Sequence, residues 1–179
     1  MKTLVFSILY SMFLNTIFAQ TLLPDSAYLG QNPPGNIPQI FAPGVISLNN
    51  RFETYPTFSP DGKEMFFSVV NAGWTTGKIY HTREQNGIWT LPVPADFSDN
   101  NYVNWESFIS PDGNRQFFTS KNRPPTPVRL DSPVNSNATD GSACVTGNGT
   151  LYFTSLRGGG YGGSIIYRAK FIDSAYSQV

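Results

Sequence analysis

Two carboxylates stand at matching positions in a repeated corner. Asp61 lies in Ser59-Pro60-Asp61-Gly62, and Asp112 lies in Ser110-Pro111-Asp112-Gly113, 51 residues further on. They resemble the paired carboxylates of acid and base catalysis. The neighbouring residues favour a different interpretation. Proline fixes φ, the acid bonds to the backbone ahead of it, and glycine supplies the positive φ that closes a turn. We therefore interpret both corners as structural turns.

Other catalytic and metal-binding patterns are weak. A nucleophile needs a base beside it, and the chain has one histidine, His81, and one cysteine, Cys144. The sequence contains no Gly-x-Ser-x-Gly elbow. Zinc takes several His or Cys ligands, and the oxygen-rich stretches 98–101 and 131–140 do not have EF-hand spacing. We predict no catalytic residue, no cofactor and no metal. Cys144 is expected to be a buried strand residue and His81 a half-exposed one.

A glycine-rich stretch, Gly158 to Gly163, matches the dinucleotide-binding letters G-x-G-x-x-G. Such sites use the amides and dipole at the start of a helix. Here the glycines precede the strand-like residues Ile165 to Ala169. We expect a long hairpin loop and no nucleotide site.

Three aromatic residues are candidate ligand contacts: Trp74, Tyr102 and Tyr161. Trp74 lies in a loop between predicted strands, with a threonine after it, where its ring can stack on a carbohydrate or a peptide. The alternative is that the loop folds the ring back onto the protein. Trp89 follows a hairpin turn and is expected to pack between strands.

The N-terminal residues 1–19 have the layout of a secretory signal peptide. A lysine at position 2 precedes an apolar run to Phe18, and Ala19 supplies the small residue before a cut at Gln20. No later segment is long and apolar enough to span a membrane. We expect an exported protein, periplasmic or secreted. Twelve basic and twelve acidic residues leave no net charge, which argues against nucleic acid or an anionic membrane as partner.

Residues 20–50 are rich in proline and glycine, which excludes a helix. We predict an extended arm docked on the body, with a short strand near 44–48. Its apolar residues are expected to be buried: Tyr28, Leu29, Ile40, Phe41, Val45 and Ile46.

The corner motif organises residues 51–179. A worn third copy, Val145-Thr146-Gly147-Asn148-Gly149, follows the second after 36 residues, with Asn148 and Gly149 as its turn residues. An aromatic strand follows each corner, at 65–68, 116–119 and 151–155. Repeats of this length are typical of β-propeller blades. We predict an all-β fold, a partial β-propeller of about three four-stranded antiparallel blades, with units near 51–100, 101–139 and 140–179.

The strands expected in the first unit are 55–59, 64–70, 78–83 and 88–91. The second unit is compressed, with Val128-Arg129-Leu130 as the remnant of a third strand. In the third unit, 171–176 opens a fourth strand that is cut short. A propeller closes with about 4 to 8 blades, so the chain is expected to be a fragment of a longer protein. Completion by oligomerisation is the alternative.

The motifs Phe58-Ser59-Pro60-Asp61-Gly62-Lys63 and Met65-Phe66-Phe67-Ser68 resemble the TolB-like and WD40-like β-propeller repeats of exported bacterial proteins. The stretch Arg157 to Gly163, leading into Ile165-Ile166-Tyr167, is similar to repeats in OmpA-linked relatives. The likeness covers 53 to about 170. It implies a propeller, either a protein-binding platform of the cell envelope or a domain beside a peptidase. In the third corner, Gly147-Asn148 replaces the Pro-Asp of the family.

Two functions are consistent with these observations. The first is an exported, non-catalytic propeller module that binds a protein or carbohydrate partner through loops at one face. The alternative is the propeller portion of a larger hydrolase or peptidase whose catalytic residues lie outside this chain.

Overall fold

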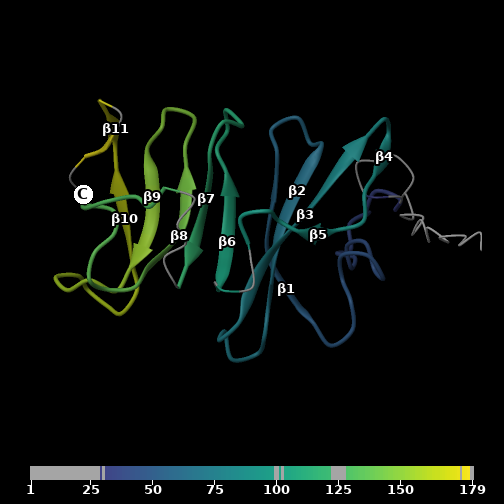
Figure 1. Cartoon of the computed structure of the whole chain (residues 1–179), viewed down its shortest axis with the longest axis horizontal. Coiled ribbons are helices and arrows are strands. Elements are labelled where there is room, and N and C mark those ends of the chain that lie inside the picture. The colour runs from purple at the N-terminus through teal and green to yellow at the C-terminus, as the bar shows by residue number, and fades with distance from the viewer. Residues whose placement is uncertain are drawn as a thin grey trace, which may run out of the picture.

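The computed structural model describes residues 29, 31–98, 101, 103–121, 128–173 and 175–177. Over these residues the protein is all-β and contains antiparallel strands but no helix (Figure 1). The predicted signal peptide, 1–19, lies outside them. The strands are β1 (Phe52–Phe58), β2 (Glu64–Val70), β3 (Gly77–Gln85), β4 (Ile88–Trp89), β5 (Val93–Pro94), β6 (Asn104–Ile109), β7 (Gln116–Ser120), β8 (Asp140–Val145), β9 (Leu151–Ser155), β10 (Ile165–Ala169), β11 (Phe171–Ile172) and β12 (Ala175–Tyr176).

The first unit forms the largest sheet, with strands in the order β1-β2-β3-β4. The predicted β2 range is confirmed, and β3 is longer than predicted at both ends. The fourth strand is broken: β4 pairs with the end of β3, and β5 pairs again with its middle. Pro92 stands between the two pieces, and proline lacks the amide hydrogen that a continuous ladder needs. Pro94 is tolerated because β5 lies at the edge of the sheet.

The prediction of four strands in every unit is wrong for the second and third units. Among its described residues, the second unit is a two-stranded sheet, β6-β7, and the predicted remnant at Val128-Arg129-Leu130 forms no strand. The third unit is the three-stranded sheet β10-β9-β8. Its predicted fourth strand instead folds into a small hairpin, β11-β12. In the sequence, Pro127 and Pro133 flank Val128-Arg129-Leu130, and prolines cannot donate ladder hydrogen bonds, which disfavours a strand there.

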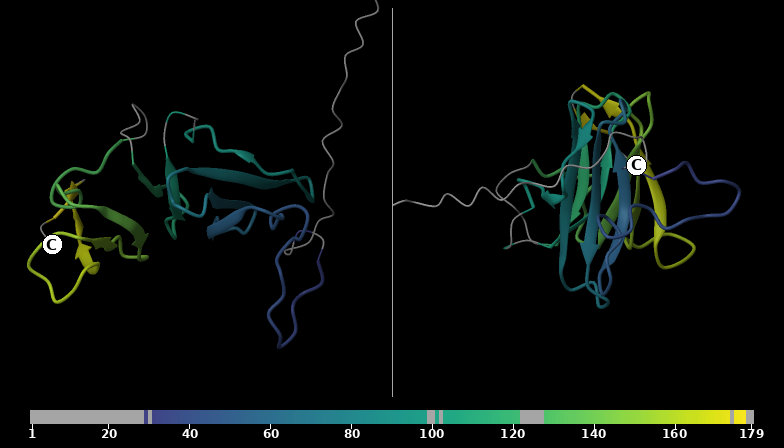
Figure 2. Two further views of the ribbon diagram at one scale, coloured as in Figure 1. Left: turned by 90° about the horizontal axis from the view of Figure 1, so that it is seen from below. Right: turned by 90° about the vertical axis from the view of Figure 1, so that its right-hand side faces the viewer.

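The sheets succeed one another in sequence order along the long axis of the molecule (Figures 1 and 2). The alternation of side chains in a strand gives each sheet two packing faces. Phe118 of the second sheet stacks on Phe97, and Phe97 in turn stacks on Phe66 of the first sheet. On the opposite face, Phe117 packs against the third sheet in a core with Leu151 and Phe153. Paired aromatics in each second strand therefore join consecutive sheets.

The arm packs on the remaining face of the first sheet (Figure 2). Leu29, Ala42 and Ile46 are buried there in one core with Met65, Phe67 and Trp89. Phe41 and Val45 pack around this core, as predicted. The prediction is wrong for Ile40, which is 69% exposed, and for the strand near 44–48, where only an isolated bridge joins Pro43 and Ser47. Tyr28 lies outside the described residues.

The three corners share one hydrogen-bond pattern. In the first, the Ser59 carbonyl accepts from the Gly62 amide at 2.9 Å, and the Ser59 hydroxyl accepts from the Glu64 amide at 2.9 Å. Asp61 accepts from the hydroxyl of Ser59 and from the Lys63 amide. Pro60 occupies the position after the serine, where its fixed φ suits the turn.

The second corner repeats these bonds with Ser110, Asp112, Gly113 and Asn114 around Pro111. Hydrogen bonds from the serine hydroxyls, and then from the following backbone amides, lower the pKa of Asp61 and Asp112. Both carboxylates thus accept hydrogen bonds within their own turns.

The third corner closes with one residue fewer. The Thr146 hydroxyl bonds to Asn148, whose side chain accepts from the Thr150 amide at 3.2 Å. Gly149 supplies a φ of +82°, as Gly62 and Gly113 supply +71° and +72°. Asparagine and threonine therefore reproduce the turn without the proline and the acid.

Replacing Gly113 by alanine should destabilise the protein by about 1 to 2 kcal/mol, because an L-residue is strained at a φ of +72°. The matched control is Gly147→Ala, since Gly147 has ordinary backbone geometry and open space around it. We expect the control to stay within about 0.5 kcal/mol of the parent. Urea unfolding measures both, and equal effects at the two glycines would contradict the turn geometry.

An arginine lies over an aromatic pair in the first and third units. Arg51 lies 5.8 Å from the ring centre of Phe67 and 5.6 Å from that of Tyr80. Its Nε donates to Glu53 at 2.6 Å, and a terminal nitrogen donates to the carbonyl of Ile46. The guanidinium thereby ties the arm to the sheet.

Arg157 makes the same set of contacts in the third unit. It lies 5.2 Å from the ring centre of Phe153 and 5.0 Å from that of Tyr167. It forms a 2.8 Å ion pair with Asp140 and donates to the carbonyls of Pro133 and Val134. Burial acts to raise the pKa of Asp140, but hydrogen bonds from Arg157, Ser155 and Ser136 outweigh it and lower this pKa.

Arg157→Ala should reduce the free energy of unfolding by about 3 kcal/mol, because it leaves the nearly buried carboxylate of Asp140 without its cation. Arg168→Ala is the control: Arg168 is exposed on β10, and its loss should cost no more than about 0.5 kcal/mol. Chemical denaturation compares the two variants. A cost for Arg157→Ala as small as that of the control would show that the ion pair contributes little.

Candidate ligand-binding surface

The first strand of each unit carries a bulge at the same place. The residue four positions before each corner has a positive φ: +51° at Tyr55, +60° at Glu106 and +51° at Ser142. The pairing of each strand with its neighbour shifts register there. None of the three is a glycine, so each holds a backbone conformation that side chains disfavour. Strained positions of this kind concentrate at functional sites.

The three bulge residues meet around the carboxylate of Glu106. Its Oε2 accepts from the Ser142 amide at 2.6 Å and from the Thr119 hydroxyl at 2.6 Å. Its Oε1 accepts from the Ser142 hydroxyl at 3.0 Å. A side chain at Gly141 would clash with this carboxylate, because a Cβ there would lie 2.7 Å from Oε2. Glu106 therefore links the second unit to the third through close contact with the backbone.

Tyr55 extends this cluster into the first unit. Burial, and then the negative charge of Glu106, raise the pKa of Tyr55. A side-chain interaction with Ser142 lowers this pKa but does not outweigh them. The phenol accordingly stays protonated at neutral pH and can donate to the carboxylate. Tyr55 is nevertheless 39% exposed, so part of its ring faces solvent.

Glu106 lacks a cationic partner in the part of the chain that the structure describes. The ion pairs found there are Arg51–Glu53, Lys63–Glu84, His81–Glu64 and Arg157–Asp140. The hydrogen bonds that Thr119 and Ser142 donate to Glu106 come from neutral hydroxyl and amide groups, which orient the carboxylate without cancelling its charge.

The loop after β2 presents Trp74 beside Tyr55. The side chain of Asn71 accepts from the amides of Thr75 at 2.8 Å and Thr76 at 3.1 Å, which fixes the loop. Trp74 has a φ of +54° and is 47% exposed. Its ring meets that of Tyr55 edge to face, with centres 6.3 Å apart. An exposed aromatic pair therefore adjoins the charged cluster.

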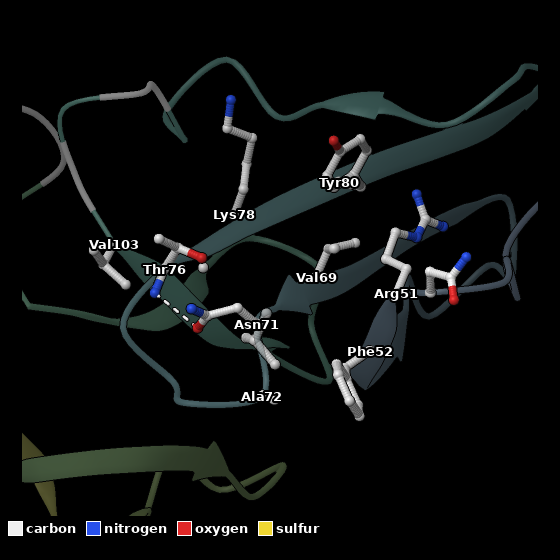
Figure 3. Close-up of a pocket in the computed structure, with 12 residues that line it drawn as sticks. Arg51, Phe52, Val69, Asn71, Ala72, Thr76, Lys78, Tyr80 and Val103 are labelled. Atoms are coloured by element: carbon white, nitrogen blue, oxygen red, sulfur yellow. Dashed lines mark hydrogen bonds between the residues drawn. The ribbon is translucent and has the colours of Figure 1, made fainter.

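The same loop forms one wall of an open hollow of about 660 Å³ (Figure 3). Asn71, Ala72 and Thr76 line it from the loop, and Phe52 and Tyr80 line it from β1 and β3. Arg51 also reaches this hollow, but Glu53 and the Ile46 carbonyl already bind its guanidinium. Arg51 is thus already paired within the protein.

Trp74 and Tyr161, two of the predicted ligand contacts, lie in loops of different units. Trp74 is exposed on its fixed loop, where its ring meets Tyr55, whereas Tyr161 is fully exposed in the glycine-rich loop of the third unit. Tyr102 lies outside the described residues. No motif in the sequence pointed to Tyr55, Glu106 and Ser142. Their common spacing of four residues before each corner was visible, but three different residue types concealed it.

His81 and Cys144 lie apart from this surface. His81 stacks on Phe66, and its Nε2 lies 3.4 Å from Glu64 without making a hydrogen bond. Cys144 is exposed on β8, which corrects its predicted burial: the register shift at Ser142 turns it outward. Among the described residues, no group of three or more His, Cys, Asp and Glu side chains could hold a metal ion. No helix in the described part of the chain is long and apolar enough to cross a membrane.

Among known proteins, no family model matches this chain, and no curated protein resembles it closely enough to count as a relative.

Stability should fall as the pH drops below about 6.5, the usual pKa of histidine. Burial lowers the pKa of His81, Glu64 and Asp96 act to raise it, and Arg83 lowers it further. The unfolded chain therefore binds a proton more readily than the folded protein in this range.

His81→Gln should flatten this dependence between about pH 7.5 and 5.5 in urea unfolding, the range around the ordinary histidine pKa. His81 is the one histidine in the sequence, so the difference between the two proteins isolates its titration. Parallel pH profiles for the parent and the variant would rule out the effect.

Proposed function

We propose that this protein is an exported, non-catalytic β-propeller module that binds a partner through the surface around Trp74. The stacked antiparallel sheets support the propeller arrangement, because each first strand lies beside that of the next unit. The Glu106 amide binds the Ser68 hydroxyl at 3.1 Å, and the Ile109 amide binds the Thr57 hydroxyl at 3.2 Å. The corners also align, since Pro60 lies next to Gly113. The layout of residues 1–19 supports export.

The observation that carries the binding function is the exposed pair Trp74 and Tyr55. A tryptophan that a fixed loop holds in solvent, at a strained φ, gains nothing in stability from its exposure. Tryptophan and tyrosine are the residues enriched where binding energy concentrates. We favour a protein over a carbohydrate partner. The two rings meet at 72° and present no continuous flat platform for a sugar.

Peptide and glycan arrays probed with the mature chain, residues 20–179, test this function. Trp74→Ala should weaken binding to the recognised probes by about 2 kcal/mol, roughly thirtyfold. Ile166→Ala is the control, because it removes an exposed aliphatic side chain from β10, in another unit. Equal binding by the Trp74→Ala variant and the parent would refute the proposed surface. Turnover of an ester or peptide substrate by the chain would refute the non-catalytic function.

Export is tested by expressing the chain with its own N-terminus in a bacterium. The mature protein should be recovered from the periplasm or the medium, with the mass of a chain that begins at Gln20. Recovery of the full-length mass from the cytoplasm would contradict this part of the proposal.

A further inference from the structure

We propose that Glu106, Tyr55 and Trp74 bind a cationic side chain of the partner, preferably the guanidinium of an arginine. This inference rests on the proposed function, because it names the chemical group that the surface around Trp74 recognises.

The first argument is charge. Glu106 is half-buried, and its hydrogen bonds from Thr119 and Ser142 come from groups without charge. The carboxylate is therefore held in a fixed position with its charge uncompensated. At the edge of a protein, a cation placed near such a group gains more than it would in water, because the effective dielectric is lower.

The second argument comes from the molecule's own arginines. In the first unit, an acid (Glu53) and two aromatic rings (Phe67 and Tyr80) surround Arg51. In the third unit, Asp140, Phe153 and Tyr167 surround Arg157 in the same way. The combination of one carboxylate and two rings therefore takes an arginine in both places.

Glu106 with Tyr55 and Trp74 is a third combination of one carboxylate and two rings, although these two rings meet edge to face, whereas those under Arg51 and Arg157 are stacked. No arginine or lysine of the described chain lies over either ring. Both rings are partly exposed, so a cation from another molecule can reach them. Guanidinium stacks on aromatic faces and forms forked hydrogen bonds to carboxylates, which favours arginine over lysine.

The probes are the peptide acetyl-Gly-Arg-Gly-amide, the same peptide with citrulline in place of arginine, and free Nα-acetylarginine amide. Citrulline keeps the shape of arginine but carries no charge. Calorimetric titration of the mature chain should show at least tenfold weaker binding of the citrulline peptide. Binding of the free amide as well would show that the cation alone suffices, whereas binding of the tripeptide alone would add a contribution from the peptide backbone. Both results support the proposal.

Glu106→Gln should weaken binding of the arginine peptide at least tenfold, because it removes the negative charge. The amide keeps the shape of the side chain and can still accept a hydrogen bond from Ser142. Asp173→Asn is the control for loss of one exposed negative charge, and its effect should stay within twofold. If Glu106→Gln changes the circular dichroism spectrum or thermal melt, Trp74→Ala and the citrulline peptide provide the same test on folded protein.

Equal affinity for the arginine and citrulline peptides would overturn the inference, and so would unchanged affinity of a folded Glu106→Gln variant. Failure of the arginine probes, with array ligands still lost in Trp74→Ala, would reject the cation and leave the proposed function in place. Arginine binding that depends on Glu106 but not on Trp74 would overturn the role of the aromatic pair.

Discussion

Contact between first strands is the constraint on which the stacked sheets depend. The first strands of the second and third units must hydrogen-bond to the preceding unit without a continuous ladder, because neighbouring sheets do not share one. The acceptor lies on β2 for the Glu106 amide and on β6 for the Ser142 amide. The bulges at Tyr55, Glu106 and Ser142 solve this by turning one residue out of register in every unit. The freed backbone amides of Glu106 and Ser142 then bind Ser68 and Glu106, respectively. Buried amides left without such partners would each cost about 1 to 3 kcal/mol.

The second unit is built without the charged pair of its neighbours. Its counterpart of Glu53 and Asp140 is Asn104, a neutral amide that is fully buried. In place of an arginine, Phe97 stacks on Phe118 with ring centres 4.9 Å apart. A carboxylate at position 104 would be a buried charge without a cation, which is costly. The second unit therefore lacks the arginine and has an amide where its neighbours have an acid, and the first change accounts for the second. The Asn104 side chain has no hydrogen-bond partner in the structure.

Local chemistry determined what the sequence could predict. The ranges of β2 and β9 were predicted correctly, because a turn with its own hydrogen bonds precedes each aromatic strand. The burial of Ile46 was also predicted, but Ile40 is exposed, since the arm touches the sheet through only part of its length. The cluster around Glu106 was not predictable in the same way. Positive φ is uncommon at a tyrosine, a glutamate and a serine, and the hydrogen bonds between Glu106 and Ser142 join residues 36 positions apart in the sequence.

The arm and the connection before the third unit make similar turns. The backbone carbonyl of Ala42 accepts from the amides of Val45, Ile46 and Ser47, and the backbone carbonyl of Asp131 accepts from those of Val134 and Asn135. Ile46 and Val134 are each buried, and the carbonyl of each accepts a hydrogen bond from the arginine of its unit. The repeating element therefore begins before its first strand, with a short entry turn that covers one face of the sheet. The last part of the arm covers one face of the first sheet, just as residues 131–136 cover one face of the third. This equivalence explains why a segment too rich in proline for a strand still packs into the core: both entry turns contribute one aliphatic side chain and one carbonyl, neither of which needs a ladder.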